Sequence, residues 1–498
     1  MSEFLLHYKR PDPITWVYLS SFLTIGLFFV FHRFWSIRNF DLLLLIMLSP
    51  GLLMVYDGRR QSMQLAEWDA AFGFVNSSDQ ASPPASVDAP RTESAASQGE
   101  ASRPLPSDAD LAVRSLQAEK REQSQRRSER LQFRGFLWLL TIQALILLRL
   151  LLDCAMVRRP LLAPNLTVGG LFFIGTSMLV FLMANVLTST ARQQREHGPS
   201  LSRAGYPLMH ALPTLPTRPD IDRHAAQSNL VSASDSAPPP ATWRVVVARI
   251  IVITAHIAVL VGIVLIGFQH FGNLRAGAAC SVLYLMVPYT AQMTGRVDHV
   301  LPAALLVWAV LMYRRPIFAG LFLGLAGSLV YYPLFLLPLW TSFYWQRGLR
   351  RFSLGVAITM MMMTALLLFG GLEQFGDRLR QMYGLWLPRS EQLEGVWGLG
   401  LLPVWRLPVL VAFVLLAWVF AIWPAQKNLG TLISCSAALM VAAQFWHGYG
   451  GGLYIAWFLP LLLLTIFRPN LEDRVALKVI GGGTTSRRRV PEMKIEAA

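Results

Sequence analysis

Long apolar segments recur along nearly the whole chain and constrain its fold more than any other feature. Nearly uncharged stretches include 16–31, 136–152, 169–187, 245–268 and 409–423. A helix needs roughly 20 apolar residues to cross the hydrocarbon core of a bilayer, and the alternating pattern of a membrane β-barrel does not occur here. The sequence therefore predicts an all-α, polytopic integral membrane protein with about 12–13 transmembrane helices and two long flexible loops.

Composition supports this class and argues against others. Hydrophobic residues make up 54% of the chain and charged residues 15%, whereas a soluble domain carries about 25% charged residues. Most Lys and Arg lie in loops and tails, where they orient helices and meet anionic membrane lipids, so we expect lipid contacts and no nucleic-acid partner despite the net charge of +15. Cys154, Cys280 and Cys435 are widely separated, which predicts neither a disulfide framework nor a zinc site. We expect no metal and no cofactor.

Thirteen apolar segments are predicted to cross the membrane. They lie near 14–32, 40–56, 135–153, 168–188, 245–268, 276–293, 298–313, 317–330, 333–346, 352–371, 403–423, 430–446 and 452–467. The stretch 316–345 is too long for one crossing and is divided at Tyr331-Tyr332-Pro333, because a residue before proline tends to leave the helical region.

Two polar interruptions divide the chain into regions. The predicted regions are 1–56 (N-terminal membrane helices), 57–134 (a disordered and charged loop), 135–190 (a membrane helix pair), 191–243 (a flexible linker), 244–467 (a membrane core) and 468–498 (a basic tail). Within the loop, Asp108 is a candidate helix cap at the start of a highly charged stretch.

The distribution of basic residues predicts an orientation for the C-terminal half only. The positive-inside rule places the tail, Arg314 and Arg315 in the cytoplasm, with 295–299, Tyr331-Tyr332, the loop 371–402 and 445–452 together on the external face of the cell membrane. Basic residues also flank both interruptions, so the same rule would place these interruptions in the cytoplasm. Thirteen crossings, however, would place them on the external face. The orientation of the first four helices therefore stays open.

The most informative polar motif is Arg296-Val297-Asp298-His299 at a membrane boundary. Ionisable groups at such a depth are costly and often functional. Arg296 suits a lipid phosphate, and Asp298 or His299 suits deprotonation of an acceptor hydroxyl. The alternative is a structural one, in which Arg296 pairs with Asp298 and His299 occupies the interface. Arg149 and Asp153, four residues apart, are similarly expected to pair along a helix.

Several short motifs resemble the GT-C type membrane glycosyltransferases, especially the bacterial mannosyltransferase-like members. The matching elements are Gly295-Arg296-Val297-Asp298, Arg314-Arg315, the small-residue run 319–324, Tyr332-Pro333, the basic run 347–351, and 446–454 leading into Phe458-Leu459-Pro460. This resemblance covers about a third of the chain. It departs from the family pattern where Tyr331-Tyr332 replaces the usual lysine before the proline.

The resemblance implies a specific activity and donor. Such a protein would transfer a sugar from a polyprenyl-phosphate donor to a lipid or glycan acceptor at the external face. It also implies an acidic base after an early membrane segment, where Asp57 is the nearest match, with Glu67 and Asp69 further along. The candidate catalytic residues are therefore Asp57, from the resemblance, and Asp298, from the polar motif. Candidate substrate-binding residues are Arg296, His299, Tyr331, Tyr332, His447 and Tyr449. A transporter or flippase and a non-catalytic membrane scaffold remain as alternatives.

Overall fold

The computed structural model describes residues 11–71, 108–153, 156, 162–198, 242–346, 348–369, 373–385, 393–425 and 427–469. Over these ranges the chain is helical, and its extended pairing is limited to isolated bridges such as Glu394–Tyr449. Seven helices of the described part are long and apolar enough to cross a membrane, and four shorter ones are also apolar. The predicted class, an all-α polytopic membrane protein, is confirmed.

The predicted membrane segments coincide with helices or with closely joined helix pairs. In chain order the main elements are α2 (Pro13–Phe28), α3 (Ile37–Ala71), α4 (Asp108–Asp153), α5 (Val168–Thr188), α6 (Ala191–His197), α7 (Thr242–Gln269), α8 (Leu274–Met286), α9 (Pro288–Met293), α10 (Val297–Leu311), α11 (Pro316–Leu329), η3 (Tyr332–Leu336), α12 (Leu337–Tyr344), α13 (Leu349–Leu368), α14 (Phe375–Tyr383), α15 (Val396–Leu399), α16 (Arg406–Ile422), α17 (Leu429–Trp446), η5 (Ile455–Trp457) and α18 (Leu459–Phe467). The division at Tyr331-Tyr332-Pro333 is confirmed, since α11 ends at Leu329 and η3 begins at Tyr332.

Small residues let several helices approach closely. A Cβ on Gly320 of α11 would collide with the backbone of α13 at Phe352, and one on Gly324 would collide with the side chain of Thr359 on the same helix. In the same way, Gly135 of α4 has no room for a Cβ against α3. Such contacts strengthen van der Waals packing between membrane helices, where the hydrophobic effect contributes little.

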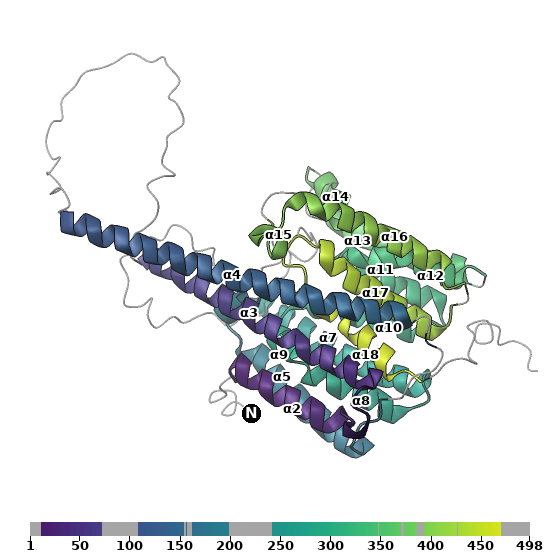
Figure 1. Ribbon diagram of the computed structural model, residues 1–498. Coiled ribbons are helices and arrows are strands. Elements are labelled where there is room, and N and C mark those ends of the chain that lie inside the picture. Colours follow the sequence, from purple (N-terminus) through teal and green to yellow (C-terminus); the bar gives the residue numbers. More distant parts are fainter. Residues whose placement is uncertain are drawn as a thin grey trace, which may run out of the picture.

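Helices α3 and α4 form an arm that projects beyond the rest of the bundle (Figure 1). We define the arm as residues 57–71 of α3 and 108–134 of α4. Both parts belong to the predicted disordered loop 57–134, so that prediction is corrected here: these residues are helical. Charged side chains four apart support the exposed helix, as in the Glu122–Arg126 ion pair. The Ser/Ala/Pro-rich run between the two parts lies outside the described residues.

Helices α8, α9, α10, α17 and α18 form the buried centre of the bundle. Helix α10 runs from Asp298 at the end that carries the arm to Leu311, which is followed by the exposed Arg314 and Arg315 at the opposite end. Arg468 also lies at the opposite end, because it pairs with Asp153 at the last residue of α4. The motif 295–299, the pair Tyr331-Tyr332 and the run 445–452, which were assigned to one face, therefore lie together at the arm end, away from these arginines.

The second interruption begins at the arm end as well. Residues 191–197 of the predicted linker form α6, whose Glu196 accepts a hydrogen bond from Tyr56 of α3 at 3.3 Å. Helix α7 finishes near the opposite end, where His270 bonds to the carbonyl of Leu311 at 2.8 Å, so α7 starts at the arm end. Residues 199–241 and the tail 470–498 lie outside the described residues.

Candidate functional site

A break between α9 and α10 brings Arg296, Asp298 and His299 into the interior. Arg296 has an extended backbone and immediately precedes α10, and Asp298 and His299 lie in the first turn of that helix. All three side chains are buried. Their exposed fractions are only 2%, 0% and 2%. The break is held from α7 by His256, whose Nε2 donates to the carbonyl of Thr294 at 3.0 Å.

The position of Asp298 within the bilayer follows from the length of α10. Between Asp298 and Leu311 the helix rises only about 20 Å, less than the roughly 30 Å of a hydrocarbon core, and any tilt shortens this depth further. Arg314 and Arg315 mark the opposite boundary just beyond Leu311. Asp298 therefore lies inside the hydrocarbon thickness, where an ionisable group is expensive to keep.

The three polar residues contact one another. Oδ2 of Asp298 lies 3.3 Å from Nη2 of Arg296 and 3.5 Å from Nε2 of His299. On its other side, His299 Nδ1 lies 2.5 Å from the hydroxyl of Tyr289. The pairing of Arg296 with Asp298, expected under the structural alternative, is thus present. It uses only one of the two carboxylate oxygens.

The C-terminal part of the chain contributes a second group of site residues to the same place. His447 follows the last residue of α17, and its Nδ1 lies 2.6 Å from the hydroxyl of Tyr332. Tyr331 in turn donates a hydrogen bond to Tyr332 at 3.0 Å. The break after α11 and the end of α17, 115 residues apart, are therefore joined at one point.

Tyr454 connects the two groups. Its ring stacks on His299 with centroids 4.6 Å apart and meets the edge of His447 at 4.6 Å. Trp457 packs against Tyr454 and donates from Nε1 to the carbonyl of Asp298 at 3.0 Å. We call this assembly the polar cluster; it comprises Arg296, Asp298, His299, Tyr332, His447 and Tyr454.

Two glutamines hold the loop that presents Tyr454. Gln143 of α4 donates to the carbonyl of Gly452 at 2.7 Å, and Gln444 of α17 accepts from the backbone N–H groups of Gly452 and Tyr454, both at 3.2 Å. Gly450 and Gly452 have positive φ angles of 74° and 98°, a region that side chains strongly disfavour. The glycine-rich sequence 448–452 is therefore needed for the path of this loop.

Tyr449 lies at the edge of the polar cluster. Its ring is 6.1 Å from that of His447, and its backbone pairs with Glu394. Glu394 also lies 3.8 Å from Arg59 of α3, which connects the C-terminal loops to the base of the arm.

Asp57 does not belong to the polar cluster. It is a half-buried residue of α3, and the charged groups that act on it are Arg60 and Asp12. Of the two candidate catalytic residues, only Asp298 has described contacts with the candidate substrate-binding side chains.

Three residues of the cluster, Asp298, His447 and Tyr454, each have a buried polar atom without a hydrogen-bond partner among the described residues. These atoms are Oδ1 of Asp298, Nε2 of His447 and the hydroxyl of Tyr454. Leaving such atoms unpaired costs about 1–3 kcal/mol each, so native proteins usually provide partners. Their concentration here favours a site that receives a polar ligand or water. Asp298 itself is fully buried.

The described cavities lie away from the polar cluster. Two are on the arm, with volumes of about 610 and 580 Å³; one of about 260 Å³ lies between α5, α7 and α8; and one of about 360 Å³ lies beside Arg149. Among the described residues, no group of histidine, cysteine or carboxylate side chains is arranged to bind a metal ion.

Sequence reasoning did not single out Tyr289, Tyr454 or Trp457 as site residues. The available signal was the position of Tyr454 and Trp457 directly after the glycine-rich run 448–452. Arg406 was also missed; it is buried and donates to the carbonyl of Trp446 at 3.3 Å from Nε and 3.2 Å from Nη2, next to His447.

Comparison with protein-family models, with curated proteins and with solved structures finds no match to this chain.

Proposed function

We propose that this polytopic membrane protein is a glycosyltransferase that moves a sugar from a polyprenyl-phosphate donor to a lipid or glycan acceptor. The observation that carries the proposal is the polar cluster, in which a membrane-buried carboxylate with one unpaired oxygen lies beside an arginine and a histidine. A purely structural Arg296–Asp298 pair does not account for the unpaired polar atoms of Asp298, His447 and Tyr454. The motifs behind the family resemblance supply five of the six cluster residues; His299 directly follows one of them.

The residues suit an inline transfer at the anomeric carbon. Asp298 accepts the proton of the acceptor hydroxyl as that oxygen forms its bond to the anomeric carbon. The bond from this carbon to the phosphate oxygen breaks, and its electron pair leaves with the polyprenyl phosphate. Arg296 stabilises the phosphate charge. His447, Tyr332 and Tyr454 offer hydrogen bonds and aromatic faces for a sugar.

The direct test is sugar transfer in proteoliposomes that contain the purified full-length protein, radiolabelled polyprenyl-phosphate sugars and a total lipid extract as acceptor. Radiolabel in a new product supports the proposal. Failure to form product with every donor offered would remove it.

One structural feature favours a second function, a lipid flippase or transporter. Interrupted helices meet at the polar cluster, namely α8 with α9, α11 with η3 and η5 with α18. Discontinuous helices around a buried polar site are typical of transporters. The same vesicles distinguish the two functions, because a flippase would move the labelled donor between leaflets without converting it to product.

A further inference from the structure

The arm carries a cluster of arginines on one side, close to the point where α4 enters the apolar part of the bundle. Arg126, Arg127, Arg130 and Arg134 all line one cavity of about 580 Å³. Because each residue turns a helix by about 100°, these four positions fall within a sector of about 100°. We call this surface the arginine groove.

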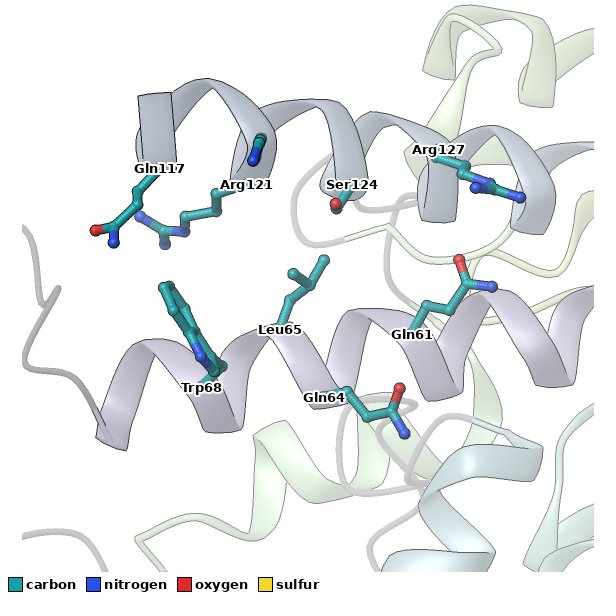
Figure 2. Close-up of a pocket in the computed structure, with 9 residues that line it drawn as sticks. Gln61, Gln64, Leu65, Trp68, Gln117, Arg121, Ser124 and Arg127 are labelled. Atoms are coloured by element: carbon teal, nitrogen blue, oxygen red, sulfur yellow. The ribbon is translucent and has the colours of Figure 1, made fainter. Parts of the chain in front are cut away.

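Helix α3 forms the second wall of the arginine groove. Gln61 of α3 lines the cavity together with Gln123 and Leu131 of α4, and no carboxylate lines it. Gln61 and Arg127 also line the neighbouring cavity of about 610 Å³ nearer the tip. Figure 2 shows Gln61 pointing from α3 toward α4 beside Arg127, so the two cavities adjoin along the arm.

Most of the charge in the arginine groove is available to a ligand. Arg126 pairs with Glu122 at 2.5 Å, whereas Arg127, Arg130 and Arg134 make no ion pair with any described residue. All four side chains are exposed. Arginine binds phosphate oxygens with two parallel hydrogen bonds and is more weakly hydrated than lysine, so this cluster suits a phosphate-bearing anion.

The height of the groove identifies the source of that anion. The apolar segment of α4 starts at Phe136. Arg134 and Arg130 therefore lie about 3 and 9 Å above this level, and Arg126 about 15 Å above it. The headgroup layer on each side of a bilayer is roughly 5–8 Å thick, so the lower part of the groove is level with lipid phosphates.

We propose that the arginine groove binds the phosphate-bearing headgroup of an anionic phospholipid. The lower arginines contact the phosphate, while Arg126 and Arg127 reach any further anionic or hydroxyl group that extends from the membrane. The proposal is independent of sugar transfer, since it concerns the arm and not the polar cluster. A bound lipid at this position also fixes the arm relative to the membrane surface.

The test is native mass spectrometry of the full-length protein titrated with phosphatidylglycerol or with phosphatidylcholine. We expect the wild-type protein to retain phosphatidylglycerol preferentially. The triple variant Arg127→Gln/Arg130→Gln/Arg134→Gln should weaken this binding by at least about tenfold, because each basic residue near an anionic surface contributes substantially to attraction. Phosphatidylcholine binding should not change.

A matched control removes the same charge from the opposite end. The variant Arg315→Gln/Arg350→Gln/Arg351→Gln changes three other exposed arginines. Unchanged lipid binding by the groove variant, or an equal loss in the control variant, would overturn the proposal. Inorganic pyrophosphate is added as a competitor, and its binding in the groove as tightly as the lipid would overturn the assignment to a membrane lipid.

Discussion

A buried ion network at the end opposite the arm gives the sharpest prediction about stability. Arg149 of α4 binds Asp41 of α3 with two hydrogen bonds, at 2.8 Å from Nε and 3.0 Å from Nη2. Its Nη1 also donates to Asp153 at 3.0 Å, which confirms the expected pairing along the helix, and Asp153 accepts from Arg468 at 2.6 Å. The network thus connects α3, α4 and the end of α18.

Replacing Arg149 by leucine leaves Asp41 buried without its cation, while Asp153 keeps Arg468. Removing one partner of a buried ion pair costs about 3–5 kcal/mol, because the remaining charge stays desolvated. We expect a loss of this size in the free energy of unfolding for Arg149→Leu. The double variant Asp41→Asn/Arg149→Leu should be less destabilised than Arg149→Leu alone, since it removes the unpaired charge.

The buried thiols of Cys280 and Cys435 provide the assay. A thiol-reactive fluorophore added to the detergent-solubilised protein reports unfolding on heating, and Arg350→Leu is the control for loss of an exposed arginine. The reasoning is refuted if Arg149→Leu unfolds at the wild-type temperature, or if the substitutions at 41 and 149 have additive effects.

Three further predictions concern the polar cluster and the topology. Gly452→Ala should destabilise the protein by about 1–2 kcal/mol, because alanine resists the positive φ of 98° at this position; thermal unfolding measures the loss, and unchanged stability would contradict the assigned loop conformation. Tyr332→Phe should cost about 1–3 kcal/mol and lower sugar transfer, because His447 Nδ1 loses its partner; wild-type values of both would exclude a role for this hydrogen bond. Single cysteines at Glu67 and Arg351 should react with an impermeant reagent from opposite sides of sealed vesicles; labelling of both from one side would contradict the placement of the two ends.

Much of the fold follows from local sequence properties. Hydrophobic length located the membrane segments, and the proline after Tyr332 located the division between α11 and η3, because both signals act on neighbouring residues. The extents of α3 and α4 did not follow. Their charged parts lack the apolar pattern of a membrane helix. They are stabilised by packing against each other, for example where Gly58 of α3 lies close to Ser128 of α4.

The candidate site was predictable only in part, for the same reason. The motif 295–299 and the run 446–454 were each recognisable from composition, yet nothing local indicates that Tyr454 packs between His299 and His447. From the sequence, Asp57 and Asp298 were equally plausible candidates for the catalytic base. Only long-range packing shows that Asp298 belongs to the polar cluster and that Asp57 does not. The bidentate contact of Arg149 with Asp41 spans 108 residues and was likewise invisible in the sequence.

The most direct test of the proposed chemistry compares Asp298→Asn with Asp57→Asn in the reconstituted sugar-transfer assay. Both variants remove one carboxylate charge with little change in size, and thermal unfolding verifies that each is folded. We expect Asp298→Asn to lower the transfer rate by at least about 100-fold, as for loss of a general base, while Asp57→Asn retains activity. Wild-type transfer by Asp298→Asn, or loss of transfer in Asp57→Asn alone, would contradict the assignment of the polar cluster as the catalytic site.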